Sequence, residues 1–144
     1  MKVHLPAYKL EAPKLFKLLV FNYLFSNGDA HFKNFSLLET PMGDYRLSPA
    51  YDLLNSRLHI EDPDFALEDG LLPRNLASGS IRKQFIKLAE QAGIIESRVN
   101  GIIQSLTSNT DKVTEMIHAS FLSDRSKLNY SQAYQTRLKK LTRP

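Results

Sequence analysis

Residues 26–36 read Ser-Asn-Gly-Asp-Ala-His-Phe-Lys-Asn-Phe-Ser, a polar loop between the apolar residues 18–25 and 35–38. Its functional groups are one carboxylate, one imidazole, one ammonium and two amides, on Asp29, His31, Lys33, Asn27 and Asn34. Groups this polar are costly to hold beside an apolar core unless they are paired or used. Residues 48–54, Ser-Pro-Ala-Tyr-Asp-Leu-Leu, follow at a short distance and add the carboxylate of Asp52.

The spacing of these residues predicts phosphoryl-transfer chemistry. Asp29 and Asn34 lie five positions apart, the offset at which protein kinases place a base for the substrate hydroxyl and an amide ligand for Mg²⁺. A carboxylate on a following loop completes such a site, because Mg²⁺ usually takes one or two carboxylates plus phosphate oxygens. Asp52 is placed to supply it if the residues between return as a hairpin. The Asp29–Asn34 spacing alone occurs in many loops, so only the three residues together are specific.

Each of these residues also has a structural interpretation. An Asp after Asn-Gly is typical of a turn, so Asp29 could have no catalytic role. Asn34 could cap the turn into the hairpin, and Asp52 could cap a short helix that follows it. His31 could be a structural hydrogen-bonding residue or a metal ligand, and Lys33 could neutralise the nearby carboxylates.

Asn-Gly-Asp-Ala-His-Phe-Lys-Asn-Phe-Ser, a short hairpin and then Tyr-Arg-Leu-Ser-Pro-Ala-Tyr-Asp-Leu-Leu resemble the catalytic core of the HipA family of bacterial serine/threonine kinases. The resemblance implies that Asp29 is the catalytic base and that Asn34 and Asp52 are the Mg²⁺ ligands. His31 and Lys33 fall on the family's D-x-H-x-K-N pattern. This implies that His31 joins Asn34 and Asp52 in binding the Mg-ATP cofactor, and that Lys33 contacts the transferring phosphate during catalysis.

The resemblance is sharp over residues 18–54 and looser in the helical remainder. It implies a transferase that moves a phosphoryl group from Mg-ATP to a hydroxyl of a protein substrate. HipA-family kinases are toxins of toxin–antitoxin pairs, so a HipB-like helix-turn-helix antitoxin is an expected partner. A kinase also needs a loop that covers the phosphates and a Lys that grips them, and the sequence holds no G-x-G-x-x-G or Walker motif.

We therefore expect the C-terminal lobe of a kinase, inactive on its own and dependent on a separate N-terminal lobe. One alternative is a non-catalytic remnant that still binds an antitoxin-like partner. Another is a helical nucleic-acid-binding or scaffold domain whose loop matches by chance. An exposed apolar patch at the lobe's docking face would favour the first two interpretations over the third.

The catalytic core is expected over residues 13–58, after an entry segment over residues 1–12. Pro13 suits the first turn of a helix. The apolar residues 15–25 predict that this helix is buried, with a buried strand as the alternative for part of it. Asn27-Gly28 would end the helix, since both residues tolerate the left-handed conformation of a C-cap.

Residues 35–39 and 45–47 predict a β-hairpin around the turn residues 40–44, and a short helix is expected from Asp52. Residues 59–80 are expected to form a loop, whose acidic part is more typical of solvated chain than of a calcium site.

Residues 81–144 predict a helical bundle, with Ser80 as the first N-cap and Gly93 as the first stop. The expected apolar faces are Ile81, Phe85, Leu88, Ala89 and Ala92; Val99, Ile102, Ile103 and Leu106; Val113, Met116, Ile117, Ser120 and Phe121; and Leu128, Tyr134, Leu138 and Leu141. The basic residues of the tail are Arg125, Lys127, Arg137, Lys139, Lys140 and Arg143. They predict a solvated helix end that complements the helix dipole, and direct nucleic-acid contact is not expected.

The composition suits one ordinary globular domain. The chain has 144 residues, of which 42% are hydrophobic and 24% charged, and its net charge is +4. It holds no cysteine, which excludes a disulfide framework and a thiolate metal site. No long uncharged apolar run predicts a membrane span. We expect one mainly α-helical, kinase C-lobe-like domain over residues 1–144, with a small β-hairpin carrying the catalytic and metal loops, in the bacterial cytoplasm.

Overall fold

The computed structural model describes residues 7–56, 71–73 and 75–143. In chain order these residues form α1 (Tyr8–Leu24), a short 3₁₀ helix (Phe32–Asn34), β1 (Leu37–Glu39), β2 (Tyr45–Leu47), α2 (Ile81–Gln91), α3 (Glu96–Thr107), α4 (Thr110–Ala119) and α5 (Asp124–Thr142). The prediction of a mainly helical fold with one small β-hairpin is confirmed. The acidic stretch 61–69 lies outside the described residues. No helix in the described ranges combines the length and the apolar character needed to cross a membrane.

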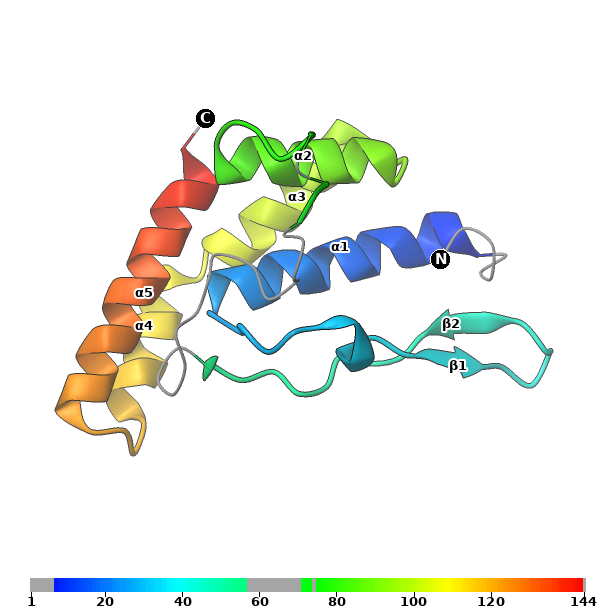
Figure 1. Cartoon of the computed structure of the whole chain (residues 1–144). Coiled ribbons are helices and arrows are strands. Elements are labelled where there is room, and N and C mark those ends of the chain that lie inside the picture. The colour runs from blue at the N-terminus through cyan, green and yellow to red at the C-terminus, as the bar shows by residue number, and fades with distance from the viewer. Residues whose placement is uncertain (1–6, 57–70, 74, 144) are drawn as a thin grey trace.

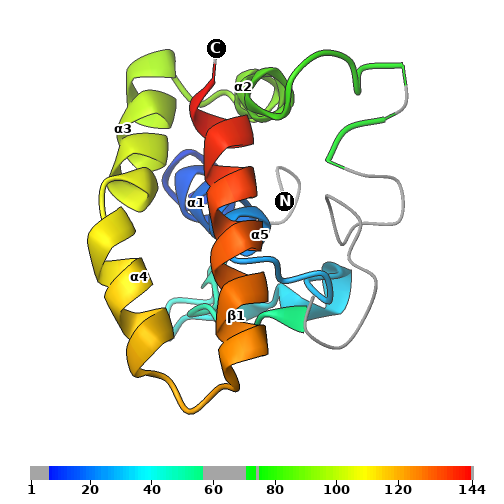
Figure 2. The ribbon, with the colours of Figure 1, turned by 90° about the vertical axis from the view of Figure 1, so that its left-hand side faces the viewer.

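The central element of the fold is α1. It has α2 and α3 on one side and the β-hairpin on the other, and α5 crosses near its C-terminal end (Figure 1). The view turned by 90° keeps this order and shows α4 running beside α5 (Figure 2). Contacts with α3, α5 and β2 hold α1 from several directions. The polar loop that follows α1 therefore begins from a rigidly packed helix, which is a suitable support for a functional site.

The N-terminus of α1 differs from the prediction. The helix begins at Tyr8 and contains Pro13, so the expected entry segment over residues 1–12 is already helical from Tyr8 onward. Proline has no N–H and removes one helical hydrogen bond, which favours the first turn as its position. Here the turn before the proline is held by tertiary packing, because the side chains of Glu11 and Ala12 are both buried.

The C-terminus of α1 comes earlier than the predicted Asn27-Gly28 cap. Ser26, with a φ of 58°, is the left-handed residue. Its amide donates to the carbonyl of Tyr23 at 3.2 Å, and the Asn27 amide donates to the carbonyl of Asn22 at 2.9 Å. These two bonds form a Schellman motif. As a result, Asn27 is turned back over the last turn of α1 and its side chain is buried.

The core lies between α1, α2, α3 and α5. Phe85 of α2 is fully buried, and its ring meets the rings of Phe16 and Tyr23 edge-on at centroid distances of 6.0 and 5.6 Å. The buried members of this core are Ala12, Phe16, Val20, Tyr23, Leu71, Phe85, Ala89, Ile94, Val99, Ile102, Ile103 and Leu141. The predicted faces of α2 and α3 are confirmed, and so is the cap of α2, where the Ser80 side chain accepts from the amide of Lys83.

The faces predicted for α4 and α5 are only partly correct. Ile117, Tyr134 and Leu141 are buried as expected. Three further residues of the predicted faces are exposed instead, namely Met116, Phe121 and Leu128. The reason is that α4 packs against α5 as a hairpin, whose outer end extends beyond α1 (Figure 1). Helical spacing predicts the buried positions correctly in the turns that contact the core. It does not show which turns extend beyond the other helices into solvent.

Arg137 is a correction to the predicted solvated tail. Its side chain is buried, its Nη1 donates to the carbonyl of Tyr23 at 2.8 Å, and its guanidinium carbon lies 4.9 Å from the Tyr23 ring centroid. This cation–π contact and hydrogen bond fasten α5 to the end of α1. Lys139 and Lys140 remain exposed in the last turn of α5, where they complement the helix dipole as predicted.

The buried carboxylate of Glu11 ties the β-hairpin to α1. Its Oε1 accepts from Lys14 Nζ at 2.6 Å, and its Oε2 accepts from the backbone amide of Leu47 in β2 at 3.0 Å. The hydrogen bond from Lys14 is the largest influence on the pKa of Glu11 and, with the Leu47 amide, lowers it below its ordinary value against the opposing effect of burial. The strand that leads to Asp52 is thereby held against α1.

Glu11→Gln is expected to reduce the free energy of unfolding at neutral pH by about 1 kcal/mol, because a neutral acceptor makes weaker hydrogen bonds than a carboxylate. The folded-state pKa lies below the unfolded value, near 4.5, so the unfolded state binds more protons between the two. The wild-type advantage is therefore complete above the unfolded pKa and is lost as pH falls through the folded pKa. Urea unfolding of both proteins at descending pH should give converging stabilities, and a constant difference would contradict this assignment.

Candidate functional site

The loop after α1 brings Asn34 back to Asp29. In the 3₁₀ turn the backbone N–H of Asn34 donates to the carbonyl of His31 at 3.0 Å, and the backbone N–H of His31 donates to the carbonyl of Asp29 at 2.8 Å. The side-chain Nδ2 of Asn34 donates to the same Asp29 carbonyl at 3.1 Å. The spacing of the two residues in the sequence therefore corresponds to a closed, hydrogen-bonded loop.

The β-hairpin carries Asp52 to this loop. β1 and β2 are antiparallel, with Leu37 opposite Leu47, and the turn between them is closed by the Thr40 amide donating to the carbonyl of Asp44 at 2.7 Å. Beyond β2 the chain runs back beside the loop, where Asn34 Nδ2 donates to Asp52 Oδ2 at 2.7 Å across 18 residues of sequence. The expectation that the hairpin would place Asp52 beside Asn34 describes this arrangement correctly.

The backbone at Asp52 is left-handed, with a φ of 54°, and residues 52–55 form no helix. The short helix expected from Asp52 is therefore wrong over these residues. In a helix the Ser56 amide would donate to the Asp52 carbonyl, but here it donates to the carbonyl of Ser26 at 3.1 Å. The Asp52 carbonyl instead accepts from Asn27 Nδ2 at 2.9 Å. Hydrogen bonds to the loop after α1 thus replace those of a helix.

Tyr51 makes a second link between the two segments. Its hydroxyl donates to the carbonyl of Lys33 at 3.0 Å, and it lies 2.6 Å from the hydroxyl of Ser36. A phenol has a single proton. The Ser36 hydroxyl is therefore the donor of the shorter bond. Both contacts lie beside Asp52 and hold it against the loop.

The remaining predicted site residues are exposed. His31 Nε2 lies 3.6 Å from Asp29 Oδ1, and about half of each side chain is open to solvent. The ammonium of Lys33 makes no hydrogen bond or ion pair with the described part of the chain. The backbone carbonyl of Lys33 accepts from the Tyr51 hydroxyl. The structure therefore gathers Asp29, His31, Asn34 and Asp52 around one loop and leaves the Lys33 side chain without a partner among the described residues.

The side chains of Asn34 and Asp52 are chemically suited to Mg²⁺, which prefers oxygen ligands and keeps several from water or phosphate. Both reach solvent, so further ligands could approach them. To bind a metal shared with Asp52, the side-chain amide of Asn34 would have to rotate by about half a turn, because it now directs its nitrogen, not its oxygen, at Asp52. No group of three or more His, Cys, Asp or Glu side chains in residues 7–56, 71–73 and 75–143 is arranged to hold a metal. Any cation bound here would therefore depend on ligands from a nucleotide or water.

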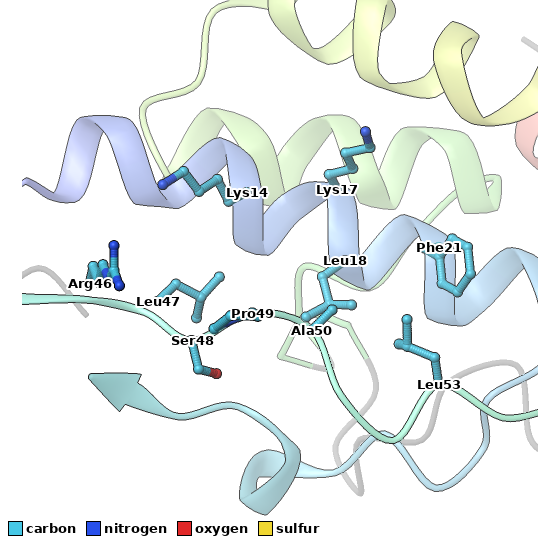
Figure 3. Close-up of a pocket in the computed structure, with 10 residues that line it drawn as sticks. All are labelled: Lys14, Lys17, Leu18, Phe21, Arg46, Leu47, Ser48, Pro49, Ala50 and Leu53. Carbon is cyan, nitrogen blue, oxygen red and sulfur yellow. The ribbon is translucent and has the colours of Figure 1, made fainter.

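An apolar hollow of about 470 Å³ adjoins the site, between α1 and the segment that joins β2 to Asp52. Figure 3 shows Leu18 and Phe21 of α1 facing Leu47, Ala50 and Leu53 across it. Lysine and arginine side chains lie along its edge, from Lys14, Lys17 and Arg46. Leu53 follows Asp52 directly, so whatever covers this hollow would also touch the segment that carries Asp52.

Three residues that hold the site were not recognised as such from the sequence: Asn27, Tyr51 and Ser56. Asn27 stood out as an amide in the polar loop, but Asn-Gly is such a common turn signal that it was interpreted as the end of a helix. Ser56 has no distinguishing sequence context. Its Oγ accepts from the Gly28 amide at 2.6 Å, a pairing across 28 residues that no local pattern indicates.

Comparison with known proteins shows the family of this chain. The family model described as "HipA-like C-terminal domain" matches residues 2–114, well over half of the chain. A curated protein of Sinorhizobium fredii (strain NBRC 101917 / NGR234), named "Putative kinase Y4dM", is 35% identical over 89 residues. These residues are 62% of this chain and 22% of that protein, so the match spans less than a quarter of the relative's length. The polar loop, the hairpin and the segment through Asp52 all lie within residues 2–114, the region that the family model matches. The chain belongs to the HipA-like C-terminal domain family.

Proposed function

We propose that this domain is the catalytic lobe of a HipA-like serine/threonine protein kinase, which transfers a phosphoryl group from Mg-ATP to a protein hydroxyl. The observation that carries the proposal is the 2.7 Å contact between Asn34 Nδ2 and Asp52 Oδ2. It joins the two candidate metal ligands, beside Asp29, from segments that are separate in the sequence. A shared Mg²⁺ site requires these two side chains to lie side by side, and this contact supports that requirement.

In this proposal Asp29 would accept the proton of the substrate hydroxyl as that oxygen bonds to the γ-phosphorus of ATP and the bond from this phosphorus to the departing ADP breaks. Its carboxylate is open to solvent, which a base acting on another protein requires. His31, whose Nε2 lies 3.6 Å from Asp29 Oδ1, would orient that carboxylate and take part in binding the nucleotide. Lys33, with no protein partner in the described ranges, would place its positive charge on the transferring phosphate.

Asp52 and the amide oxygen of Asn34 would hold Mg²⁺, which neutralises negative charge on the phosphates of ATP. To serve as a ligand, Asn34 would turn its amide over and release the Asp29 carbonyl and the Asp52 carboxylate. Asp52 would keep its place, because its backbone is held by Asn27. When Mg²⁺ binds, the Asn34 side chain would therefore rotate, and the Asp52 side chain would keep its position.

A working kinase also needs a loop over the phosphates and a Lys that grips them. We propose that a kinase N-terminal lobe supplies both and docks over the apolar hollow between Leu18, Phe21 and Leu53. The support is the apolar lining of this hollow beside Asp52, since exposed apolar surface of this kind marks interaction sites. A helix-turn-helix antitoxin partner, a protein substrate and a cytoplasmic location belong to the same proposal.

A second candidate is a non-catalytic member of the family that binds a partner. It is favoured by one observation: both protons of the Asn34 amide are already used, on Asp29 and Asp52, so the site is internally satisfied without a metal. A nucleic-acid-binding role has less support, because Arg137 of the basic tail is buried against Tyr23.

Calorimetric titration with ATP tests the proposal. We expect binding in the presence of Mg²⁺ and little or none in its absence, because Asp52 without a cation would repel the phosphates. Binding that is equally strong without Mg²⁺ would argue for an anion site of another kind. A protein that binds ATP in neither condition would be either a lobe that needs its N-terminal partner or a non-catalytic one, and the same titration on the assembled kinase would separate the two.

A further inference from the structure

Asp52 has an unusual backbone for the residue on which the site depends. In the described ranges, only Asp52 and Ser26 have a positive φ without being glycine, and Ser26 is explained by the end of α1. A left-handed non-glycine residue costs of order 1–3 kcal/mol and persists only where its surroundings impose it. The side chain of Asp52 is exposed and residues 52–55 form no regular element. Something else must therefore hold this backbone.

Asn27 makes the required contacts. It is only 5% exposed, and its Nδ2 donates to the Asp52 carbonyl at 2.9 Å and to Asn22 Oδ1 at 3.3 Å. Its Oδ1 accepts from the Asp29 amide at 3.3 Å. A primary amide has two donor protons and one acceptor oxygen, so all three groups are used. One buried side chain thereby links the backbones of the candidate base and the candidate metal ligand.

Ser56 holds the far end of the same segment. Its Oγ accepts from the Gly28 amide at 2.6 Å and donates to the carbonyl of Ser26 at 3.3 Å. Residues 52–56 are therefore attached to the loop after α1 at both ends, at Asp52 through Asn27 and at Ser56 itself. With the ends attached, the backbone between has little freedom to leave the left-handed conformation at Asp52.

We propose that Asn27 is the positioning residue of this site: its buried amide sets the left-handed backbone at Asp52 and thereby directs the carboxylate at Asn34. It acts through Asp52 and Asp29 and touches neither nucleotide nor metal. The inference rests on the proposed function for its purpose, but the geometric claim stands on the contacts alone and can be tested without any ligand.

The test compares Asn27→Ala and Asn27→Ser with the wild type by NMR. Ser keeps a polar atom near the Asp29 amide but is too short to reach the Asp52 carbonyl. We expect the Asn34 side-chain amide protons to shift and to exchange faster with solvent in both variants, and the Asp52 carbon shifts to leave their left-handed values. Affinity for Mg-ATP should fall about tenfold or more, the usual effect of removing a group that orients a metal ligand.

Asn22→Ala is the matched control, because it removes the neighbouring 3.3 Å bond and leaves the Asn27–Asp52 bond in place. It should leave the Asn34 and Asp52 signals nearly unchanged. Unchanged signals in both Asn27 variants would overturn the proposal while leaving the proposed kinase function intact. Altered signals, together with an assembled kinase whose wild type binds no Mg-ATP, would support the positioning and reject the function. If neither Asn27 variant folds, Asn27 is a folding residue and its assignment to positioning is wrong.

Discussion

Asp29→Asn is expected to slow phosphoryl transfer by about 10²–10⁴-fold, the range contributed by a general base. Asparagine has nearly the same shape but cannot accept the hydroxyl proton. The rate would be followed as ADP release from Mg-ATP by this lobe assembled with the rest of the kinase. Binding of Mg-ATP should change little, because the proposed Mg²⁺ ligands Asn34 and Asp52 make no hydrogen bond with the Asp29 carboxylate.

Stability should be nearly unaffected by the same change. The loop bonds of Asp29 come from its backbone amide and carbonyl. Among the described residues its carboxylate has only the exposed contact to His31 at 3.6 Å, and such contacts contribute less than about 1 kcal/mol. Asp111→Asn, at an exposed position on α4, is the control and should retain full activity. An Asp29→Asn protein that unfolds would show that Asp29 is a structural residue, and one that keeps its full rate would show that Asp29 is not the base.

Phe85→Ala is expected to lower the free energy of unfolding by about 3–5 kcal/mol, a large fraction of the roughly 5–15 kcal/mol that stabilises a typical domain. Phe85 is fully buried and its edge-on ring contacts reach Phe16 and Tyr23 of α1. Its loss would leave a cavity between α1 and α2, close to the end of α1 from which the polar loop begins.

Phe121→Ala is the matched control, since it removes the same side chain at a fully exposed position. Surface changes of this kind usually stay within about 0.5 kcal/mol. Urea unfolding of the two variants and the wild type measures both effects. Similar losses in the two variants would mean that the assigned core is wrong, and a negligible effect of Phe85→Ala would mean that α2 is not packed on α1.

The helical part of the fold could be predicted where one face of a helix meets the core. The periods of residues 81–92 and 96–107 identified buried Phe85, Ala89 and Ile103, and Ser80 was recognisable as a cap. Exposure at Met116 and Phe121 could not be predicted, because it depends on how far the α4–α5 hairpin extends beyond its neighbours. The predicted start of α1 was wrong for a similar reason: tertiary contacts at Glu11 outweigh the local preference of Pro13 for the first turn of a helix.

The candidate site divides in the same way. The chemistry of Asp29, Asn34 and Asp52 is local and could be interpreted from residue types and spacing. The residues that hold it are paired over long distances in sequence, such as Asn27 with Asp52 and Ser56 with Gly28. A positive φ at Asp52 also has no clear sequence signal: aspartate tolerates the left-handed region better than most residues, but few aspartates adopt it. The candidate residues could therefore be found from the sequence, and the residues that support them could not.

The most direct test of the central claim is calorimetric binding of ATP, with and without Mg²⁺, to the wild type, Asp52→Ala and the carboxylate control Asp111→Ala. Asp52 and Asn34 are proposed to bind the cation together, so we expect Mg²⁺-dependent binding in the wild type and in Asp111→Ala, and its loss in Asp52→Ala. Mg²⁺-dependent binding of equal strength in all three proteins would contradict the claim, because the cation would then be held somewhere other than at Asp52.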